Sequence, residues 1–574
     1  MSKFLRSTTT IKHALPTIQP KPTTTTFVFR SLGTSSSKSS AAGSENPINF
    51  RASVVGSALI GLGAGILISS LDLFSSSQTA STIIDASRST SGEQQTYPPP
   101  FGSKEDYSNG IRDLRDYFKS LGREDDVSTD KGDLETHGIS EWSFHKEHRP
   151  SVVVWPLTTE EVQKVVQIAN QYNMPVTPYS GGTSLEGHFS APHGGISIDL
   201  NRMDKIIEIH EADGDMVVQP GIGWETINSE LKSRDIKLFF PLDPGPGATI
   251  GGMAACGCSG TNAVRYGTAK AEWFLNFTVV LPSGEVIKTR QRARKSSAGW
   301  DLTKMFIGAE GTLGIVTEAT IRLTPLLPTR CAVVNFPNVR NAVAAATEVV
   351  GHGHPVQCVE FLDDQMMKAI NQQSGSKYPE RDSLFFKFQG SDASMKEVAQ
   401  SVSAVVKEHG GRDFQFSKDA AEAESLWQSR KAALWSAMGM YPDCKAWTTD
   451  VCVPISRLPK LVEETKADII NRGLSACHMG HVGDGNVHSV ILFKGDEELA
   501  KVKEAVHEMV HRAQRLDGTA TGEHGVGLGK IEYLEAELGP GTVRTMEGIK
   551  KHLDPKGLFN PGKLYPNLGA KPDF

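Results

Sequence analysis

The sequence predicts an α+β protein, and three observations lead to that class. Between residues 151 and 200, short β-branched and apolar runs alternate with one clear helical pattern. At 279–287, two short apolar runs stand on either side of Pro-Ser-Gly, which is typical of two strands joined by a turn. From about residue 328 onward, strand, helix and strand patterns recur, which favours an antiparallel sheet carrying helices on one face.

One helix in the first half can be located from its start. Thr158-Thr-Glu-Glu161 has the spacing of a capping box, and Val162, Val165, Val166 and Ala169 follow at helical spacing. This pattern predicts an amphipathic helix that begins at Thr158. Strands are expected around it at 151–155, 175–178, 196–200, 216–219, 279–281 and 285–287.

The second half continues the alternation of strands and helices. Apolar, β-branched or aromatic runs predict strands, and longer stretches with helical spacing predict helices. In order, we expect a strand at 332–336, a helix at 342–350, a strand at 384–388, a helix at 395–408 and a strand at 448–453.

Length and composition exclude several classes of protein. At 574 residues the chain exceeds what one hydrophobic core usually supports, so two or three domains with terminal extensions are expected. Its seven cysteines are irregularly spaced, which favours free thiols, and no Cys-x-x-Cys-His is present to attach haem. Residues 1–71 hold seven of the 60 Lys and Arg and one of the 66 Asp and Glu, which leaves 53 basic and 65 acidic side chains and a net charge of −12. Nucleic acid is therefore not expected as a partner.

The N-terminal segment has the composition of a targeting sequence. Residues 1–44 carry six Lys and Arg and no acidic side chain, which is typical of a mitochondrial presequence, although a disordered tail has a similar composition. Residues 52–71 are uncharged and, at about 1.5 Å per residue, long enough to span a bilayer as a helix. Their glycines weaken the hydropathy, so a cleaved sorting signal and a permanent anchor both stay open. Basic residues before this segment and acidic ones after it predict a body that faces the intermembrane space.

Two short motifs predict a metal site. His481-Val-Gly-Asp-Gly-Asn-Val-His488 places two imidazoles around a stretch that forms tight turns, and Glu523 lies in Thr-Gly-Glu-His524. Two histidine nitrogens and one carboxylate oxygen suit a borderline divalent metal and leave coordination positions open, as in a catalytic site. A hairpin with two solvated imidazoles is the alternative.

Three glycine-rich segments predict a large, flat ligand. Residues 178–188 follow an expected strand and offer successive backbone N–H groups that can cradle a diphosphate. Residues 244–262 are too long and too rich in small side chains for a simple turn. Residues 308–316 again combine glycines with the entrance of a strand, and none of the three has the spacing of a Rossmann or Walker motif.

Six ordered motifs make the chain similar to a known family from about residue 145 to its end. It resembles the FAD-binding oxidoreductases of the vanillyl-alcohol oxidase superfamily, in their D-2-hydroxyacid dehydrogenase branch, and most of all its mitochondrial members. Asp450–Leu458 and the anchor-like N-terminus strengthen the likeness. The six motifs lie at 181–188, 248–253, 308–318, 481–488, 522–525 and 554–563.

The resemblance implies a domain order and an FAD site. The FAD-binding domain would be of the p-cresol methylhydroxylase type, with two subdomains, and a cap domain would hold an antiparallel sheet covered by helices. The implied order is a presequence (1–51), a hydrophobic segment (52–71), a linker (72–100), a helical lead-in (101–144), the FAD-binding domain (145–327), the cap (328–550) and a segment returning to the FAD site (551–574). Noncovalent FAD would contact Pro178, Ser180, Gly181, Gly182, Thr183, Ser184, Gly187, His188, Pro244, Thr249, Gly251, Gly252, Cys258, Ser259, Ile315, Val316, Asn560 and Lys563.

The resemblance also implies a reaction. His481, His488 and Glu523 would bind Zn²⁺ or Mn²⁺, and Arg430 would hold the substrate carboxylate, unless it is merely a helix-surface arginine. His524 would take the hydroxyl proton while a hydride passes to the flavin. The substrate would be a D-2-hydroxy acid, with D-lactate giving pyruvate, and cytochrome c in the intermembrane space would accept the electrons.

Three alternatives to this reaction are considered. Another acid of the same branch, D-2-hydroxyglutarate or glycolate, is the nearest, but members that act on hydroxyglutarate carry a Lys where Thr448 aligns, so Thr448 favours a short monoacid. An oxidase that passes electrons to oxygen is the second. A noncatalytic, membrane-tethered flavin module is the third, and it would lack the His481, His488 and Glu523 set, which is present.

Overall fold

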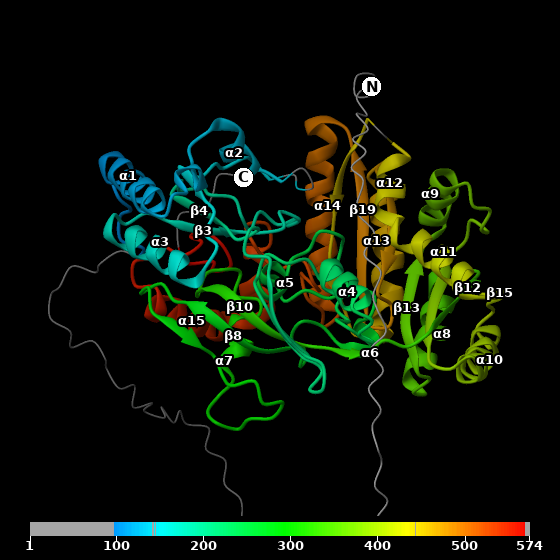
Figure 1. Ribbon diagram of the computed structural model, residues 1–574. Coiled ribbons are helices and arrows are strands. Elements are labelled where there is room, and N and C mark those ends of the chain that lie inside the picture. The colour runs from blue at the N-terminus through cyan, green and yellow to red at the C-terminus, as the bar shows by residue number, and fades with distance from the viewer. Residues whose placement is uncertain (1–96, 141–142, 144, 442, 569–574) are drawn as a thin grey trace, which may run out of the picture. The chain divides into compact units, whose positions relative to one another are not determined.

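The computed structural model describes residues 97–140, 143, 145–441 and 443–568, and within these ranges the chain folds around four sheets (Figure 1). The expected presequence, the hydrophobic segment at 52–71 and most of the linker lie outside the described residues. Among the described helices, none combines the length and apolarity that a membrane crossing requires. The mixture of helices with largely antiparallel sheets confirms the α+β prediction.

A small sheet with three parallel strands opens the fold. Its strand order is β1 (Val127–Ser128), β2 (Val152–Val154), β4 (Ile196–Asp199) and β3 (Val176–Tyr179), with only β1 antiparallel to its neighbour. The predicted helix is α3 (Thr159–Gln171), and the Thr158 hydroxyl accepts a hydrogen bond from Glu161 N as expected. The Glu161 carboxylate does not complete a capping box, because it accepts instead from Leu157 N and Arg123.

The C-terminal segment runs beside this first sheet, and its last residues also pack against Val526, Leu534 and Val543 of the second half. Val176 donates its N–H to Leu558 O and accepts from Asn560 N, so residues 558–560 run beside β3. In Figure 1 the red C-terminal segment accordingly lies beside the cyan and green first half. Leu558 and Phe559 are buried in the same hydrophobic cluster as strands β2 and β4.

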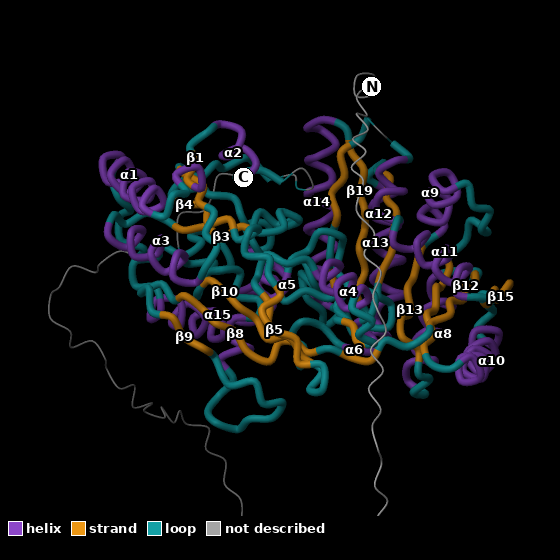
Figure 2. The backbone as a smooth tube through the Cα atoms, in the orientation of Figure 1, coloured by secondary structure: helices purple, strands orange, loops and turns teal. Residues whose placement is uncertain are grey.

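A five-stranded antiparallel sheet forms the second part of the first half. Its order is β5 (Ile206–His210), β6 (Asp215–Val218), β10 (Ile315–Arg322), β8 (Phe274–Val280) and β9 (Val286–Lys288), and β7 (Leu238–Phe239) pairs separately with β11 (Thr324–Pro325). Much of the chain around α5 (Ile250–Cys256) is loop (Figure 2), which leaves backbone available for ligand contact. The other helices here are α1 (Lys104–Ser120), α2 (Lys131–Thr136), α4 (Trp224–Ser233), α6 (Ala263–Tyr266), α7 (Leu302–Phe306) and the short η1 (Glu124–Asp126).

The second half is built on one antiparallel sheet of eight strands. Their order is β15 (Arg412–Phe416), β12 (Thr329–Asn335), β14 (Ser383–Gln389), β13 (Val356–Leu362), β18 (Ser475–Gly480), β19 (Asn486–Phe493) and β16 (Lys445–Thr448), with β17 (Val451–Cys452) also paired to β19. Its helices are α8 (Val339–Gly351), α9 (Asp364–Ser374), α10 (Asp392–Glu408), α11 (Ala420–Lys431), α12 (Ala433–Gly439), α13 (Leu458–Asn471), α14 (Gly495–Arg515), α15 (Leu534–Leu553), η2 (Ile455–Arg457) and η3 (Ile531–Tyr533).

Helices cover both faces of this sheet, whereas the sequence pattern suggested one. Val334 packs with α8, α10 and α13 in one hydrophobic cluster, and its neighbour Val333 packs with α9, α11 and α12 in another. Every residue of β13 is buried, as is expected of a strand enclosed on both sides. The three successive apolar residues at 384–386 were a signal for this arrangement, because a strand with one face in water would alternate apolar and polar side chains.

An acidic cluster beside β13 leads to a prediction about stability. Burial raises the pKa of Asp382 to about 6; Lys466 opposes the shift, and Asp363 and Asp364 add to it. The folded state therefore binds more protons than the unfolded state between the unfolded pKa of 3.8 and about 6, and stability falls as pH rises through that window. Asp382→Asn is expected to raise the free energy of unfolding by about 1 kcal/mol at pH 8, after discounting for solvent screening, and to leave it unchanged at pH 4. Thermal melts at both pH values test this, with exposed Asp125→Asn as the control; equal gains at both would contradict it.

Candidate active site

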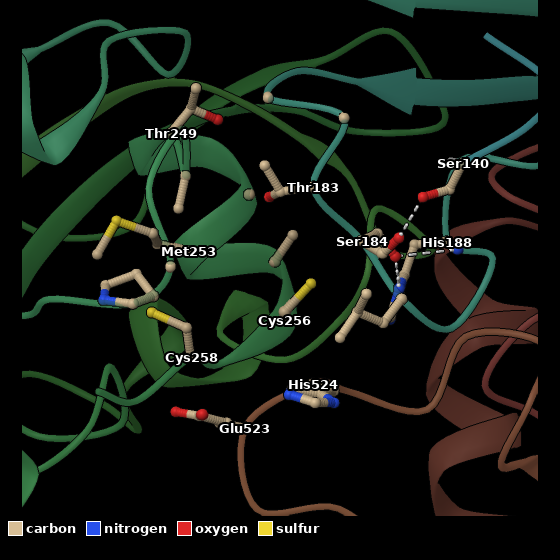
Figure 3. A pocket seen from close by; sticks show the side chains of 18 of the residues that line it. Ser140, Thr183, Ser184, His188, Thr249, Met253, Cys256, Cys258, Glu523 and His524 are labelled. Atoms are coloured by element: carbon tan, nitrogen blue, oxygen red, sulfur yellow. Dashed lines mark hydrogen bonds between the residues drawn. The ribbon is translucent and has the colours of Figure 1, made fainter. Parts of the chain in front are cut away.

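The loops of the first half and the cap enclose a cavity of about 870 Å³. Residues after β3, around α5 and at the start of β10 form one wall, and residues of α11, β19 and the 523–524 segment line it as well. Figure 3 shows Glu523 and His524 across the space from Thr183, Cys256 and Cys258. All the residues expected to contact FAD line this cavity except Gly187, Ser259 and Lys563.

Two glycine-rich loops meet closely along one wall. Ser180 Oγ lies 2.7 Å from Thr249 Oγ1, which joins the first loop to the start of α5. Gly182 has a φ of 66°, a conformation that side chains with a Cβ rarely adopt. A Cβ at Gly181 would stand 2.5 Å from the carbonyl oxygen of Gly247 on the second loop. The close approach depends on glycine, and it builds a backbone-lined wall that suits a diphosphate.

Gly181→Ala is expected to lower the FAD content of the purified protein strongly. Its methyl group would overlap a backbone oxygen at 2.5 Å, so the two loops must separate. The ratio of flavin to protein absorbance measures the loss. Gly351→Ala is the control, because nothing lies within 4 Å of the Cβ that it would add. Full flavin content in Gly181→Ala protein would show that this contact does not shape the cofactor site.

Three side chains converge where the sequence predicted a metal. His481 follows β18, His488 lies in β19, and Glu523 approaches from the loop after α14. Glu523 Oε1 lies 3.3 Å from His481 Nε2 and 3.1 Å from His488 Nε2. The turn between the two strands needs glycine at Gly485, where φ is 79° and a Cβ would stand 2.0 Å from Val453 O. Both histidines are buried, so the structure does not support a hairpin with solvated imidazoles.

The Nδ1 atoms of both histidines lie beside oxygen acceptors, an arrangement that suits histidines bound to a metal. His481 Nδ1 lies 2.9 Å from Glu360 Oε1, and His488 Nδ1 lies 3.0 Å from Thr449 O. Protons on both Nδ1 atoms leave the two Nε2 lone pairs facing Glu523, an arrangement common around protein-bound metals. Among the described atoms, buried Glu523 Oε2 has no hydrogen-bond partner. This orphaned carboxylate oxygen and the converging nitrogens fit a divalent cation.

A second possible ligand group, Asp450 with His488 and His524, fits a metal less well. Asp450 Oδ2 already accepts hydrogen bonds from the backbone N–H groups of Glu523 and His524, each at 2.8 Å, and Oδ1 accepts from Asn486 at 2.7 Å. Burial alone would raise the pKa of Asp450, but His524, Lys530 and His488 outweigh it and lower the pKa well below its ordinary value. Asp450 therefore acts as a fixed anion that orients the loop beneath the site.

A carboxylate from the first half holds the other end of the same loop. Glu310 accepts hydrogen bonds from Val526 N at 2.6 Å and Gly527 N at 2.8 Å. Asn560 Nδ2 in turn donates to Glu310 O. The segment that carries Glu523 and His524 is thus held by Asp450 from the cap and by Glu310 from a loop of the expected FAD site.

His524 has the surroundings of a proton acceptor. Its ring stacks on that of His488, with centroids 5.1 Å apart, and its buried Nδ1 has no hydrogen-bond partner among the described residues. Burial lowers the pKa of His524, with Asp450 opposing the shift. The imidazole is consequently neutral near pH 7 and free to accept a proton from a ligand in the cavity.

Arg430 is buried and faces the cavity, so it is not a helix-surface arginine. Arg430 lies in the last turn of α11 and is 6% exposed. Its Nε and Nη2 donate to Glu360 Oε2 at 3.1 and 2.6 Å, while Nη1 lies 3.8 Å from Met479 Sδ. One edge of the guanidinium is therefore occupied by Glu360, and the Nη1 end remains for an anionic ligand.

Lys563 lies behind the cavity wall instead of on it. Its ammonium group donates to Ser190 O and, at 2.7 Å, to Asn560 Oδ1. Burial lowers the pKa of Lys563 to about 7, with Glu310 opposing the shift. Lys563 thus holds Asn560, which does line the cavity, in place.

Glu360, Asp450 and Glu310 are three buried carboxylates around this site to which sequence reasoning gave no role. Glu360 is the one charged residue of β13, and a charge inside a fully buried strand indicates a buried ion pair. Glu310 has a φ of 53°, and its position in a glycine-rich motif was the other available signal. Which loop each carboxylate would bind depends on contacts between residues far apart in the chain.

Comparisons with known proteins place the chain among flavoproteins. A profile of the FAD binding domain matches residues 150–290, and one for the C-terminal domain of FAD linked oxidases matches residues 328–564. These matches confirm FAD as the expected cofactor.

Two curated relatives cover most of the chain. A protein of Arabidopsis thaliana named mitochondrial D-lactate dehydrogenase (cytochrome) is 44% identical over 467 residues, which are 81% of this chain and 82% of that protein. The mitochondrial D-lactate dehydrogenase (cytochrome) 1 of Saccharomyces cerevisiae is 43% identical over 469 residues and 79% of each chain. Among solved structures, p-cresol methylhydroxylase with substrate bound aligns with a TM-score of 0.66 at 18% identity, covering 83% of this chain and 100% of that one. This last likeness concerns the fold alone and confirms the expected type of FAD-binding fold.

Proposed function

The chain belongs to the FAD-linked oxidases, in the group of the mitochondrial D-lactate dehydrogenases (cytochrome), and from this premise we propose that it oxidises D-lactate to pyruvate with FAD. One observation carries the proposal within the structure. His481, His488, Glu523, His524 and Arg430 line the same cavity as the glycine-rich loops of the FAD-binding domain.

Each side chain then has a defined task. Bound FAD would supply the two-electron acceptor, and a Zn²⁺ or Mn²⁺ ion held by His481, His488 and Glu523 would supply a Lewis acid that lowers the pKa of the substrate hydroxyl. Arg430 binds the substrate carboxylate through the Nη1 end of its guanidinium. His524 accepts the hydroxyl proton on an imidazole nitrogen. Together these residues orient the α-hydrogen toward the wall of glycine-rich loops.

Thr448 bears on the size of the substrate. Thr448 lines the cavity at the end of β16. A threonine hydroxyl carries no charge to pair with a second substrate carboxylate, which supports a short monoacid over D-2-hydroxyglutarate. Lys431 and Lys445 also line the cavity and would attract an anionic substrate.

The acceptor, the location and the domain limits complete the proposal. Cytochrome c would receive the electrons, and the body would face the intermembrane space from the mitochondrial inner membrane, with residues 1–51 as presequence and 52–71 as sorting segment or anchor. The names of the two relatives support a mitochondrial location and a cytochrome acceptor. We also propose domain limits at residues 145, 328 and 551.

Anaerobic stopped-flow reduction of the flavin tests the proposal. FAD-loaded protein would be mixed in turn with D-lactate, L-lactate, glycolate and D-2-hydroxyglutarate, and the reduced protein then with ferricytochrome c. Fast bleaching by D-lactate, followed by reduction of the cytochrome, is the expected result. Bleaching by D-2-hydroxyglutarate and not by D-lactate would show that D-2-hydroxyglutarate is the substrate. No bleaching by any of the four acids would overturn the proposed activity.

A further inference from the structure

Among the residues that the structure describes, Glu360 is the one carboxylate that contacts both the expected substrate clamp and an expected metal ligand. It lies within β13 and is fully buried, with an exposed fraction of 0%. Its Oε2 accepts from Arg430 Nε at 3.1 Å and Nη2 at 2.6 Å. Its Oε1 lies 2.9 Å from Nδ1 of His481. A single side chain therefore fixes two groups with different tasks.

The contact with His481 decides which ring nitrogen carries the proton. An ionised carboxylate has only acceptors, so a hydrogen bond to Nδ1 requires the proton to be on Nδ1. Nε2 then presents its lone pair to the space beside Glu523 and His488. No other described side chain bonds to His481 Nδ1, so Glu360 is the described group that selects the tautomer able to bind a metal.

The contact with Arg430 decides which edge of the guanidinium is available. Both donors on the Nε–Nη2 edge point to Glu360, so the planar group is held with its Nη1 end toward other ligands. The negative charge of Glu360 also offsets part of the positive charge of Arg430. That offset weakens the attraction for the carboxylate of a substrate or product and favours release of the product anion.

We propose that Glu360 is a positioning residue that sets the tautomer of His481 for metal binding and the orientation of Arg430 for the substrate carboxylate. The inference rests on the proposed function and adds a residue to it. Glu360 connects Arg430 to His481, because it is the described side chain that contacts both.

Glu360→Gln is the decisive variant, because it keeps the shape and removes the charge. Arg430 has only donors, so the amide oxygen must turn toward it and the amide NH₂ group toward His481. Nδ1 must then accept, which moves the ring proton to Nε2 and blocks that ligand. We expect the affinity for Zn²⁺ and for Mn²⁺ to fall about 10- to 100-fold in FAD-loaded protein, measured by competition with a chromogenic chelator.

Kinetics give a second readout that a loss of folding would not imitate. Arg430 keeps an acceptor in Glu360→Gln and loses a competing negative charge, so KM for D-lactate should not rise. At a limiting concentration of the metal ion, kcat should fall together with the affinity for the metal. A rise in KM without loss of metal affinity would overturn the proposed role.

Asp363→Asn is the matched control. Asp363 follows β13 directly, is 1% exposed, and accepts hydrogen bonds from Met366 N, His478 N and Lys466. The change removes a buried charge close to Glu360 without touching Arg430 or His481. It should lower stability and leave metal affinity at the wild-type value.

The outcomes separate this inference from the proposed function. Equal metal affinity in wild-type and Glu360→Gln protein would overturn it, and so would a wild-type protein that binds neither ion. Oxidation of D-lactate is measured in a separate experiment, by flavin bleaching, so the proposed function is tested independently of metal affinity. Should Glu360→Gln protein not fold, Glu360→Asp decides, because its shorter stem cannot reach both partners. Unchanged metal affinity together with unchanged KM in Glu360→Asp protein would overturn the inference.

Discussion

Replacement of His524 by Asn is expected to slow reduction of the flavin by D-lactate by about 10²- to 10⁴-fold, the usual contribution of a general base. Asn can form hydrogen bonds but cannot accept a full proton near pH 7. FAD content should change little, because His524 does not lie on the glycine-rich loops. KM should also change little, because Arg430 still binds the substrate carboxylate. Single-turnover stopped-flow measurement isolates the affected step.

Metal affinity measured on the same variant distinguishes the two possible ligand groups. If His481, His488 and Glu523 bind the ion, His524→Asn protein keeps its affinity. If the group of Asp450, His488 and His524 binds it, affinity is lost together with activity. The control is His478→Asn: His478 is a buried histidine of β18 whose Nδ1 lies 2.8 Å from Ser489 Oγ and which is absent from the cavity wall. If His524→Asn protein reduces its flavin at the wild-type rate, His524 is not the proton acceptor.

The order of the motifs along the chain carried most of the prediction of the site. Glycine-rich loops need particular backbone conformations, and these requirements appear in the sequence as glycines at fixed spacing. Histidines on either side of a short turn likewise converge because the turn itself brings them together, as His481 and His488 do. Such local signals predicted residues on both walls of the cavity.

The supporting carboxylates could not be predicted because their partners are distant in sequence. Glu310 lies 216 residues from Val526, and Glu360 lies 70 residues from Arg430 and 121 from His481. A single buried acid in the sequence indicates that a partner exists, but which partner it has depends on how sheets and loops pack. The helices on both faces of the cap sheet were missed for a related reason, since the recurring order of strands and helices does not say on which face of the sheet each helix packs.

The placement of the loop at 521–527 links the two halves of the protein. Asp450 holds it from the second half and Glu310 from the first half, in both cases through backbone N–H groups. Backbone donors do not depend on side-chain rotamers, so the loop is held more rigidly than one fixed by surface side chains. This explains how Glu523 and His524 can keep a fixed position relative to loops of the first half without belonging to a helix or strand.

Arg430→Lys is expected to raise KM for D-lactate by at least about 30-fold, equivalent to about 2 kcal/mol of binding free energy. Lysine keeps the positive charge, so Glu360 is not left as an unpaired buried anion, which would threaten the fold. A single ammonium group on a flexible stem cannot, however, hold Glu360 along one edge and a substrate carboxylate at the other end, as the planar guanidinium can. Steady-state kinetics with D-lactate give KM and kcat separately, and flavin absorbance confirms that FAD is retained.

The control for this variant is Arg123→Lys, which changes an ion pair of similar chemistry far from the cavity. Arg123 Nη1 donates to both oxygens of Glu161, at 2.8 and 2.9 Å, and does not line the cavity. Its replacement should lower the melting temperature and leave KM unchanged. If Arg430→Lys shows the same pattern as this control, Arg430 serves the fold alone, and the substrate carboxylate must be bound by another cation of the cavity, with Lys431 and Lys445 the next residues to test. If KM rises only in Arg430→Lys protein, the buried guanidinium binds the substrate, and its pairing with Glu360 is what keeps a permanent charge tolerable inside the protein.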